Sequence, residues 1–147
     1  MQSTAASAGL IRRLASLIYE ALIVTALALI AGLAFLVPLG LATGDDATYG
    51  LWLWLFRVWL FAVFGMYFGW FWVHGGQTLP MRAWRLRLVT LDNQPVDLSG
   101  ALRRYLLAWP SVLAGGLGLL WALVDRDRQF LHDRLAGTRL IRVDARP

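Results

Sequence analysis

The first half of the chain consists of two long apolar runs separated by a short polar connection. The first run covers residues 14–41 and contains one formal charge, Glu20, and the second covers residues 51–73 and contains one, Arg57. About 20 apolar residues at a rise of ~1.5 Å cross a hydrocarbon core of ~30 Å. Both runs are therefore predicted to be membrane-spanning helices. The first is too long for the apolar region of a signal peptide, so we expect it to remain as a span.

Tryptophans mark both ends of the second run, with Trp52 and Trp54 at its start and Trp70 and Trp72 at its close. Trp52 and Trp70 would lie roughly 27 Å apart along a helix, which is close to the spacing of the two interfacial belts of a bilayer. The connection over residues 42–50 is short and rich in Gly and Asp, which favour turns. We therefore expect the two spans to form an antiparallel hairpin.

Small side chains recur at helical spacing in both predicted spans. Such strips let another helix approach closely, and the GxxxG spacing in the second span is typical of helix-packing faces. The strip in the first span contains Ala21, Thr25, Ala28 and Gly32, and the pair in the second span is Gly65 and Gly69.

Residues 84–90 alternate in character, with Trp84, Leu86 and Leu88 on one face and arginines on the other. This alternation predicts a strand, and the sequence Asp-Asn-Gln-Pro at residues 92–95 predicts a turn after it. A lone strand leaves its backbone groups unpaired, so it needs a partner. Residues 138–143 are the other candidate strand, and we expect the two to pair in a small sheet outside the membrane.

A third apolar run covers residues 105–124. The helix that contains it is expected to begin near Leu98, where Asp97 or Ser99 can cap its first turn. The run is interrupted by helix-breaking or flexible residues, namely Pro110, Gly115, Gly116 and Gly118.

Arginines are distributed unevenly over the connections. Two precede the first span, none lies between the first and second spans, five follow the second span and six follow residue 124. The positive-inside rule therefore places the N-terminus, the second connection and the tail in the cytoplasm. Three simple spans would put the tail outside. A third run that enters and leaves on one side removes the conflict, since such segments are tolerated where protein covers their backbone. An ordinary third span remains the alternative.

Composition agrees with one membrane domain over residues 1–147. The chain is 59% hydrophobic, has no cysteine and carries a net charge of +5. All its basic residues are arginine, and their retention on the cytoplasmic side explains the charge better than nucleic-acid binding does. The predicted fold is all-α and transmembrane: two full spans, a third apolar segment that is a re-entrant hairpin or a third span, and a small cytoplasmic β element.

Glu20 is the first candidate for chemistry, because an ionisable group inside a membrane helix is costly and indicates a function by default. Arg13 lies about two turns earlier, so both side chains project from nearly the same face. Glu20 could bind a proton or a cation in exchange, or it could form a structural ion pair with Arg13. Arg57 could reach the outer headgroups or extend toward Glu20.

Asp133 lies in a charged, turn-rich segment near the end of the chain. It could cap a helix, or hold Arg104 or Arg13 at the membrane surface; with the tail inside, Arg13, Glu20 and Asp133 could form one network. The two histidines have no second ligand at metal spacing, so no metal site is predicted. No serine has a credible base nearby and no phosphate loop is visible, so we expect neither an enzyme nor a cofactor.

Several of these residues together resemble the RDD family of small bacterial membrane proteins. The resemblance rests on Arg13-Leu14-Ala15, Glu20, Gly75-Gly76-Gln77-Thr78-Leu79, Arg85 to Val89, and Leu131-His132-Asp133-Arg134-Leu135-Ala136-Gly137-Thr138. The family is named after one arginine and two aspartates. Arg13 matches the arginine and Asp133 the second aspartate, whereas Glu20 stands where the first aspartate is expected. Pro80-Met81 also stand where the family usually has Gly-Lys.

The resemblance implies a multi-pass protein of the bacterial inner membrane. Transport of unidentified ligands has been proposed for the family, and cation/proton exchange has been suggested for some members. The leading expectation is therefore a transport-related membrane protein, and the competing one is a non-catalytic assembly or scaffolding subunit. The expected partners are the lipid bilayer and either further copies of the chain or a larger membrane protein, because so few helices cannot enclose a pathway.

Overall fold

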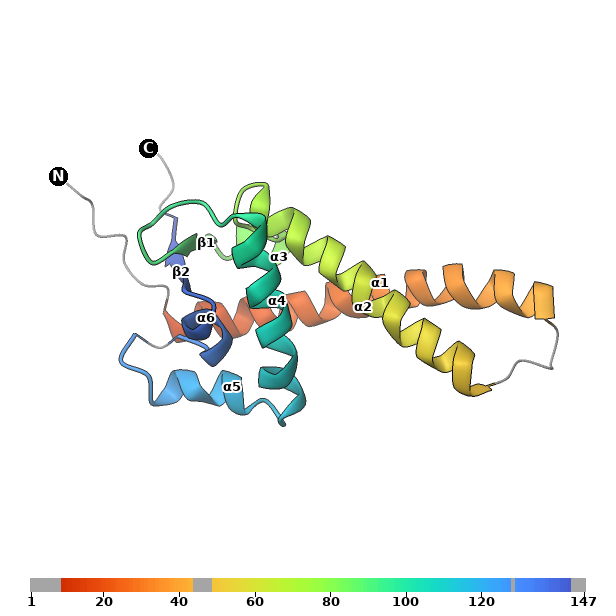
Figure 1. The fold of residues 1–147 in the computed structure, drawn as a ribbon. Helices are drawn as coiled ribbons and strands as arrows, with labels where there is room; N and C mark the ends of the chain where they lie inside the picture. The colour runs from red at the N-terminus through yellow and green to blue at the C-terminus, as the bar shows by residue number, and fades with distance from the viewer. Residues whose placement is uncertain (1–8, 44–48, 128, 144–147) are drawn as a thin grey trace.

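The computed structural model describes residues 9–43, 49–127 and 129–143. Two long helices, α1 (Leu10–Thr43) and α2 (Tyr49–Val73), run antiparallel and extend from one end of the molecule (Figure 1). Both are long and apolar enough to cross a membrane, so the two predicted spans are confirmed. The connection between them, at residues 44–48, lies outside the described residues.

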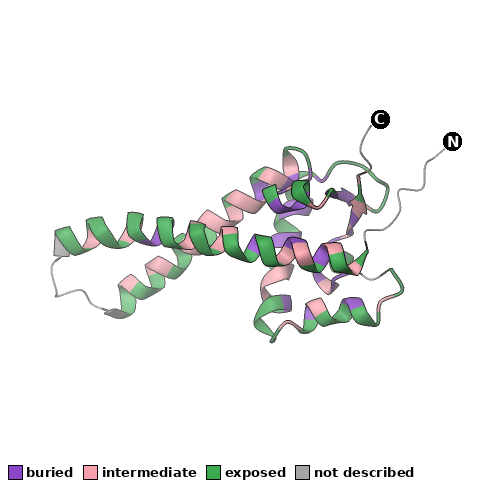
Figure 2. Cartoon of the chain, turned by 180° about the vertical axis from the view of Figure 1, so that it is seen from behind, coloured by how far each residue is buried: buried purple, intermediate pink, exposed green. Residues whose placement is uncertain are grey.

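The far part of this hairpin has few buried residues, and purple positions gather at the opposite end of the molecule (Figure 2). The helices touch through small and aromatic residues. A Cβ added at Gly32 would lie 3.7 Å from the ring of Phe56, and the indole N–H of Trp59 donates to the carbonyl of Ala31 at 3.0 Å. Large apolar side chains such as Leu22 and Leu33 are exposed, as expected for helices that face lipid.

A short helix and a two-stranded sheet follow α2. Helix α3 (Leu79–Ala83) begins after Thr78, whose hydroxyl accepts from the backbone N–H of Met81 at 3.4 Å. The sequence did not predict it. Strand β1 (Leu86–Thr90) pairs antiparallel with β2 (Thr138–Arg142), which confirms the expected sheet.

One face of β1 is covered and the other is covered in part, since Arg87 is exposed. Leu86 and Leu88 are buried as the alternation predicts, and Val89 on the other face is buried as well. The predicted turn follows the strand, where Asn93 has a positive φ of 61° and donates its N–H to the carbonyl of Thr90 at 3.0 Å.

Helix α4 (Leu98–Leu113) begins where the sequence predicts. The Oδ1 of Asp97 accepts from the N–H of Gly100 at 2.9 Å, and the Ser99 hydroxyl donates to Oδ2 at 2.7 Å. These bonds lower the pKa of the exposed Asp97 carboxyl, since they stabilise its charged form. Of the two candidate caps, Asp97 is therefore the one that caps the helix.

The predicted interruption of the third apolar run is confirmed, but it is shorter than expected. Pro110 lies inside α4 and does not end it. The break falls at Gly115 and Gly116, which have φ values of 68° and 79°. Helices α5 (Leu117–Leu120) and η1 (Trp121–Leu123) then turn back at 104° to α4. A Cβ at Gly118 would lie 2.9 Å from the Cα of Ser111, so only glycine lets the two arms approach this closely.

The third apolar segment returns to the end from which it starts. Along the chain it follows β1 and precedes β2, and these two strands are hydrogen-bonded to each other. Helix α6 (Leu131–Leu135) connects the segment to β2. In Figure 1 the sheet, α3 and α6 gather where α1 begins and α2 ends. The bend fits both alternatives that the sequence leaves open, a re-entrant hairpin and a third span that is broken.

Candidate functional site

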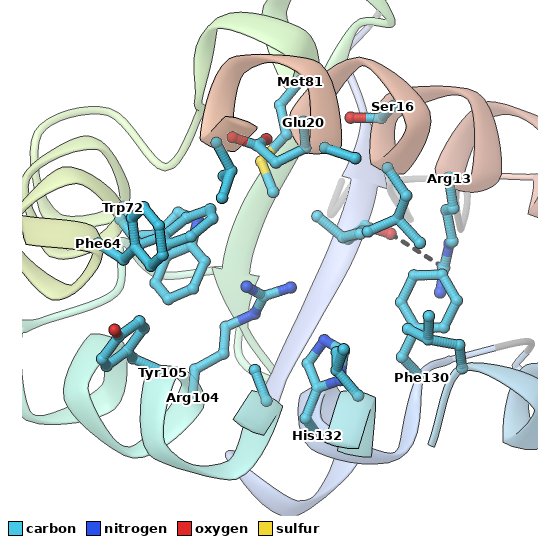
Figure 3. Close-up of a pocket in the computed structure, with 18 of the residues that line it drawn as sticks. Arg13, Ser16, Glu20, Phe64, Trp72, Met81, Arg104, Tyr105, Phe130 and His132 are labelled. Carbon is cyan, nitrogen blue, oxygen red and sulfur yellow. Dashed lines mark hydrogen bonds between the residues drawn. The ribbon is translucent and has the colours of Figure 1, made fainter. Parts of the chain in front are cut away.

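A cavity of about 380 Å³ lies where α1, α2 and α4 meet the sheet end of the molecule (Figure 3). Most of its wall is aromatic or aliphatic, with Phe64, Trp72 and Tyr105 on one side. Its arginine, carboxylate and histidine side chains come from three different elements, and they are Arg13, Glu20, Arg104 and His132. A mainly apolar cavity with a few convergent polar groups is the usual form of a binding site.

Glu20 is 8% exposed, and hydroxyl groups hold its carboxylate. Tyr67 on α2 donates to Oε1 at 2.9 Å, and Thr78 donates to Oε2 at 2.5 Å. Hydrogen bonds to a carboxylate are stronger than bonds between neutral groups. The two contacts therefore connect α1 with α2 and with the start of α3.

Arg13 is 1% exposed and donates from Nη2 to the carbonyl of Leu140 at 3.2 Å. This contact connects the start of α1 with β2. Arg13 and Glu20 line the same cavity, yet the carboxylate oxygens of Glu20 are within hydrogen-bonding distance of the two hydroxyls rather than of the guanidinium. The arrangement differs from the direct pair that the sequence suggested, because the hairpin brings polar groups of α2 and α3 against this face of α1.

Asp133 is fully buried and binds Arg104. Its Oδ1 accepts from Nε at 2.7 Å and lies 2.6 Å from Nη2. The guanidinium of Arg104 also lies 4.2 Å above the ring of Trp72. Asp133 sits in the first turn of α6, so this group of three residues fastens α6 to α4 and α2. Of the roles considered from the sequence, holding Arg104 is the one the geometry favours.

His132 is buried beside this ion pair, with Nε2 3.6 Å from the Oδ1 of Asp133. Burial lowers its pKa to about 4, because the cationic form loses hydration, so the ring is neutral at pH 7. Within the described residues, three buried polar atoms of this region have no hydrogen-bond partner: Trp72 Nε1, His132 Nδ1 and Asp133 Oδ2. An unpaired buried polar atom costs about 1–3 kcal/mol, so a cluster of three calls for an explanation.

The structure keeps the remaining candidates away from this cavity. Arg57 is exposed on α2 and does not line it. A Cβ at Gly65 would lie 3.2 Å from the ring of Tyr105, so this glycine faces α4 rather than the small-residue strip of α1. A Cβ at Gly69 would meet nothing within 4 Å. Across residues 9–43, 49–127 and 129–143, no cluster of three His, Asp or Glu side chains could hold a metal ion.

Two contributors to the site could not be singled out from the sequence. Tyr67 is a polar residue inside an apolar run, and Thr78 belongs to the run that carries the family resemblance. Both residues are visible in the sequence, but nothing in it indicates that their hydroxyls meet at Glu20. Their convergence depends on how α2 rotates against α1.

The family model described as RDD family matches residues 7–137. The chain belongs to the RDD family. Membership agrees with a membrane protein and with the two long apolar helices. Searches of curated proteins and of solved structures found no match to this RDD protein.

The three residues that the resemblance matches to the arginine and aspartates of the family name all lie at this cavity or directly behind it. Arg13 and Glu20 line it, and Asp133 reaches it through Arg104. Among the described residues of this RDD protein, Arg13, Glu20 and Asp133 each bind other groups, and the charge of Asp133 also acts on Arg13. Arg13 binds a carbonyl of β2, Glu20 binds one hydroxyl on α2 and one just before α3, and Asp133 binds a guanidinium on α4.

Proposed function

We propose that this protein takes part in transport across the bacterial inner membrane, with Glu20 as the group that exchanges a proton for a cation. The observation that carries the proposal is a buried carboxylate, held on a membrane helix, that lines a cavity. Ionisable groups in such positions are seldom retained without a function.

The partners of Glu20 suit an exchanging group. A guanidinium in direct contact would favour the ionised carboxylate strongly, whereas a hydroxyl can either donate or accept a hydrogen bond. Tyr67 and Thr78 can therefore satisfy the ionised carboxylate by donating, and one of them can accept from the protonated form. The site can thus change its protonation state without leaving a buried polar group unpaired.

The proposed orientation places the N-terminus in the cytoplasm, because the connection between the spans lacks arginine and the other connections are rich in it. Two long helices cannot enclose a pathway, so we propose that the protein works as a homo-oligomer or with a larger membrane protein. The proposal involves no enzymatic step, no cofactor and no nucleic acid.

One observation favours a second candidate, a non-catalytic assembly or scaffolding subunit. The two hydrogen bonds of Glu20 tie together α1, α2 and the start of α3. A carboxylate that only fixes helix register would make the same contacts, and its removal would affect stability instead of flux.

The substitution Glu20→Gln separates the two candidates, because glutamine keeps the size and the hydrogen bonds but cannot titrate. In sealed phospholipid vesicles containing a pH-sensitive dye, a jump in Na⁺ or K⁺ should move protons through the wild type. We expect the variant to lose about tenfold or more of this flux while its unfolding temperature changes little. Arg57→Gln, which removes an exposed charge from the other span, serves as the matched control and should keep its flux.

Full flux in Glu20→Gln, or an equal loss in Arg57→Gln, would contradict exchange at Glu20. A wild type without flux, together with a lower unfolding temperature for Glu20→Gln, would support the scaffolding role instead.

A further inference from the structure

The cavity has two properties that an ion site does not need. Its volume of about 380 Å³ equals roughly a dozen water-sized groups at ~30 Å³ each. Most of its wall is apolar, built from residues such as Phe68, Ala108 and Leu119. A small hydrated ion gains nothing from such a wall, whereas a hydrocarbon chain gains the free energy of leaving water or of close packing.

The cavity also opens at an apolar part of the protein surface. Val112 of α4 lines it and is nevertheless 53% exposed, and Ala21 of α1 lines it and is exposed as well. Around this part of α4 the exposed residues are apolar, including Leu106 and Leu113. A molecule of the bilayer could therefore enter between α1 and α4 without crossing a polar surface.

Opposite charges face this cavity from different sides. Arg104 rises from α4 with its guanidinium directed toward the middle of the cavity, and Glu20 approaches from α1 on the other side (Figure 3). The salt bridges of the described residues do not join the two. A guanidinium has five N–H donors, of which Asp133 takes two. A carboxylate can accept about four hydrogen bonds, and Glu20 accepts one at each oxygen from its hydroxyl partners.

A further donor lies beside Arg104. The indole Nε1 of Trp72, a residue 3% exposed and on the cavity wall, has no hydrogen-bond partner among the residues that the structure describes. Indole N–H groups only donate, so this group needs an acceptor. His132 on the same wall is neutral at pH 7 and adds no charge. The Arg104 side thus offers N–H donors to an anion, and the Glu20 side offers acceptors to a cation.

We propose that this cavity binds one zwitterionic phospholipid with a primary ammonium headgroup, drawn from the surrounding bilayer. The phosphate lies against Arg104 and Trp72 Nε1, the ammonium lies against Glu20, and an acyl chain fills the apolar part between α2 and α4. The charges of the headgroup match those of the walls, and its net charge of zero leaves the balance of the buried arginines and carboxylates unchanged. This binding does not depend on ion exchange at Glu20.

The test counts bound lipids by native mass spectrometry on the purified, delipidated full chain. The probes are phosphatidylethanolamine, phosphatidylglycerol and phosphatidylcholine with identical acyl chains. We expect one tightly retained phosphatidylethanolamine per chain, with retention about fivefold or more above the other two lipids, because among the three only its headgroup has a positively charged N–H donor for Glu20.

Two variants locate the site. Ala108→Phe fills the cavity and should lower lipid retention about tenfold, whereas Leu106→Phe, a similar change at a lipid-facing position of the same helix, should have little effect. Glu20→Gln keeps the volume of the cavity and should remove the preference for phosphatidylethanolamine over phosphatidylglycerol.

Equal retention of the three lipids by the wild type would overturn the proposal. If Glu20→Gln still prefers phosphatidylethanolamine over phosphatidylglycerol, the proposal is also overturned. This second variant tests the site even if Ala108→Phe fails to fold. Displacement of the lipid by phosphoethanolamine, which has no acyl chain, would overturn the lipid assignment and indicate a soluble ligand instead. A wild type that retains the lipid but shows no ion flux would refute the exchange function and leave this inference standing.

Discussion

Replacing Asp133 by leucine should destabilise the protein strongly. The substitution leaves the guanidinium of Arg104 buried without its counter-charge, since the side chains of Arg104 and Asp133 are 6% and 0% exposed. Removing one partner of a buried ion pair typically costs about 3–5 kcal/mol. The ring of Trp72, 4.2 Å from the guanidinium, retains part of the stabilisation, so we expect a loss near the lower end, about 3 kcal/mol.

The measurement is the free energy of unfolding in mixed micelles, followed by tryptophan fluorescence. A loss of about 3 kcal/mol shifts the folded-to-unfolded ratio roughly a hundredfold. Adding Arg104→Met to Asp133→Leu should recover most of the loss, because a buried ion pair and well-packed apolar residues of similar volume are often equally stable.

The half-exposed Arg134, which pairs with Asp125, supplies the control. Arg134 is 50% exposed at its side chain, and its Nη1 lies 2.5 Å from the Asp125 carboxylate. Arg134→Gln should cost less than about 1 kcal/mol, because solvent screens the half-exposed guanidinium and the Asp125 carboxylate keeps its hydrogen bonds from the N–H groups of Asp127 and Gln129. The reasoning is refuted if Asp133→Leu costs no more than this control, or if the double substitution is no more stable than Asp133→Leu alone.

Two further predictions concern acid stability and topology. Burial lowers the pKa of His132 from its ordinary 6.5 to about 4, so between these pH values the unfolded chain binds more protons than the folded one. The free energy of unfolding should therefore fall by up to about 3 kcal/mol as pH drops from 6.5 to 4. The measurement compares the change in unfolding free energy from about pH 7 to about pH 4.5 in the wild type with the same change in His132→Gln. If the third apolar segment is re-entrant, single cysteines at the exposed positions Asp92 and Asp127 should both react with an impermeant thiol reagent only after cells are opened, and labelling of the two from opposite sides would make the segment an ordinary span.

The sequence predicts those elements for which few other structures or pairing partners are possible. A run such as residues 51–73 is too long and too apolar to be anything but a span, and the strand at residues 84–90 had one candidate partner. The cap at Asp97 follows from local chemistry that the preceding and following residues already show. In each case the decisive information lies within a short window or in a choice between two segments.

The candidate site depends on relations that the sequence does not contain. Glu20 stands out as a charge in an apolar run, but the hydroxyl of Tyr67 reaches it only because of the rotation of α2 about its own axis. The same rotation turns Gly65 toward Tyr105 instead of toward α1. A rotation of this kind is set by the packing of whole faces, and a pattern of small residues allows several of them.

The contact between Arg13 and Leu140 restricts how the protein can fold during its synthesis, because the two residues are separated by 127 positions in the chain. A ribosome that adds about 5–20 residues per second needs roughly 6–25 s to travel from one to the other. During this interval β2 does not yet exist, so neither this hydrogen bond nor the pairing of β2 with β1 can form. Both long helices are therefore synthesised before the sheet end can close, because its closure needs β2.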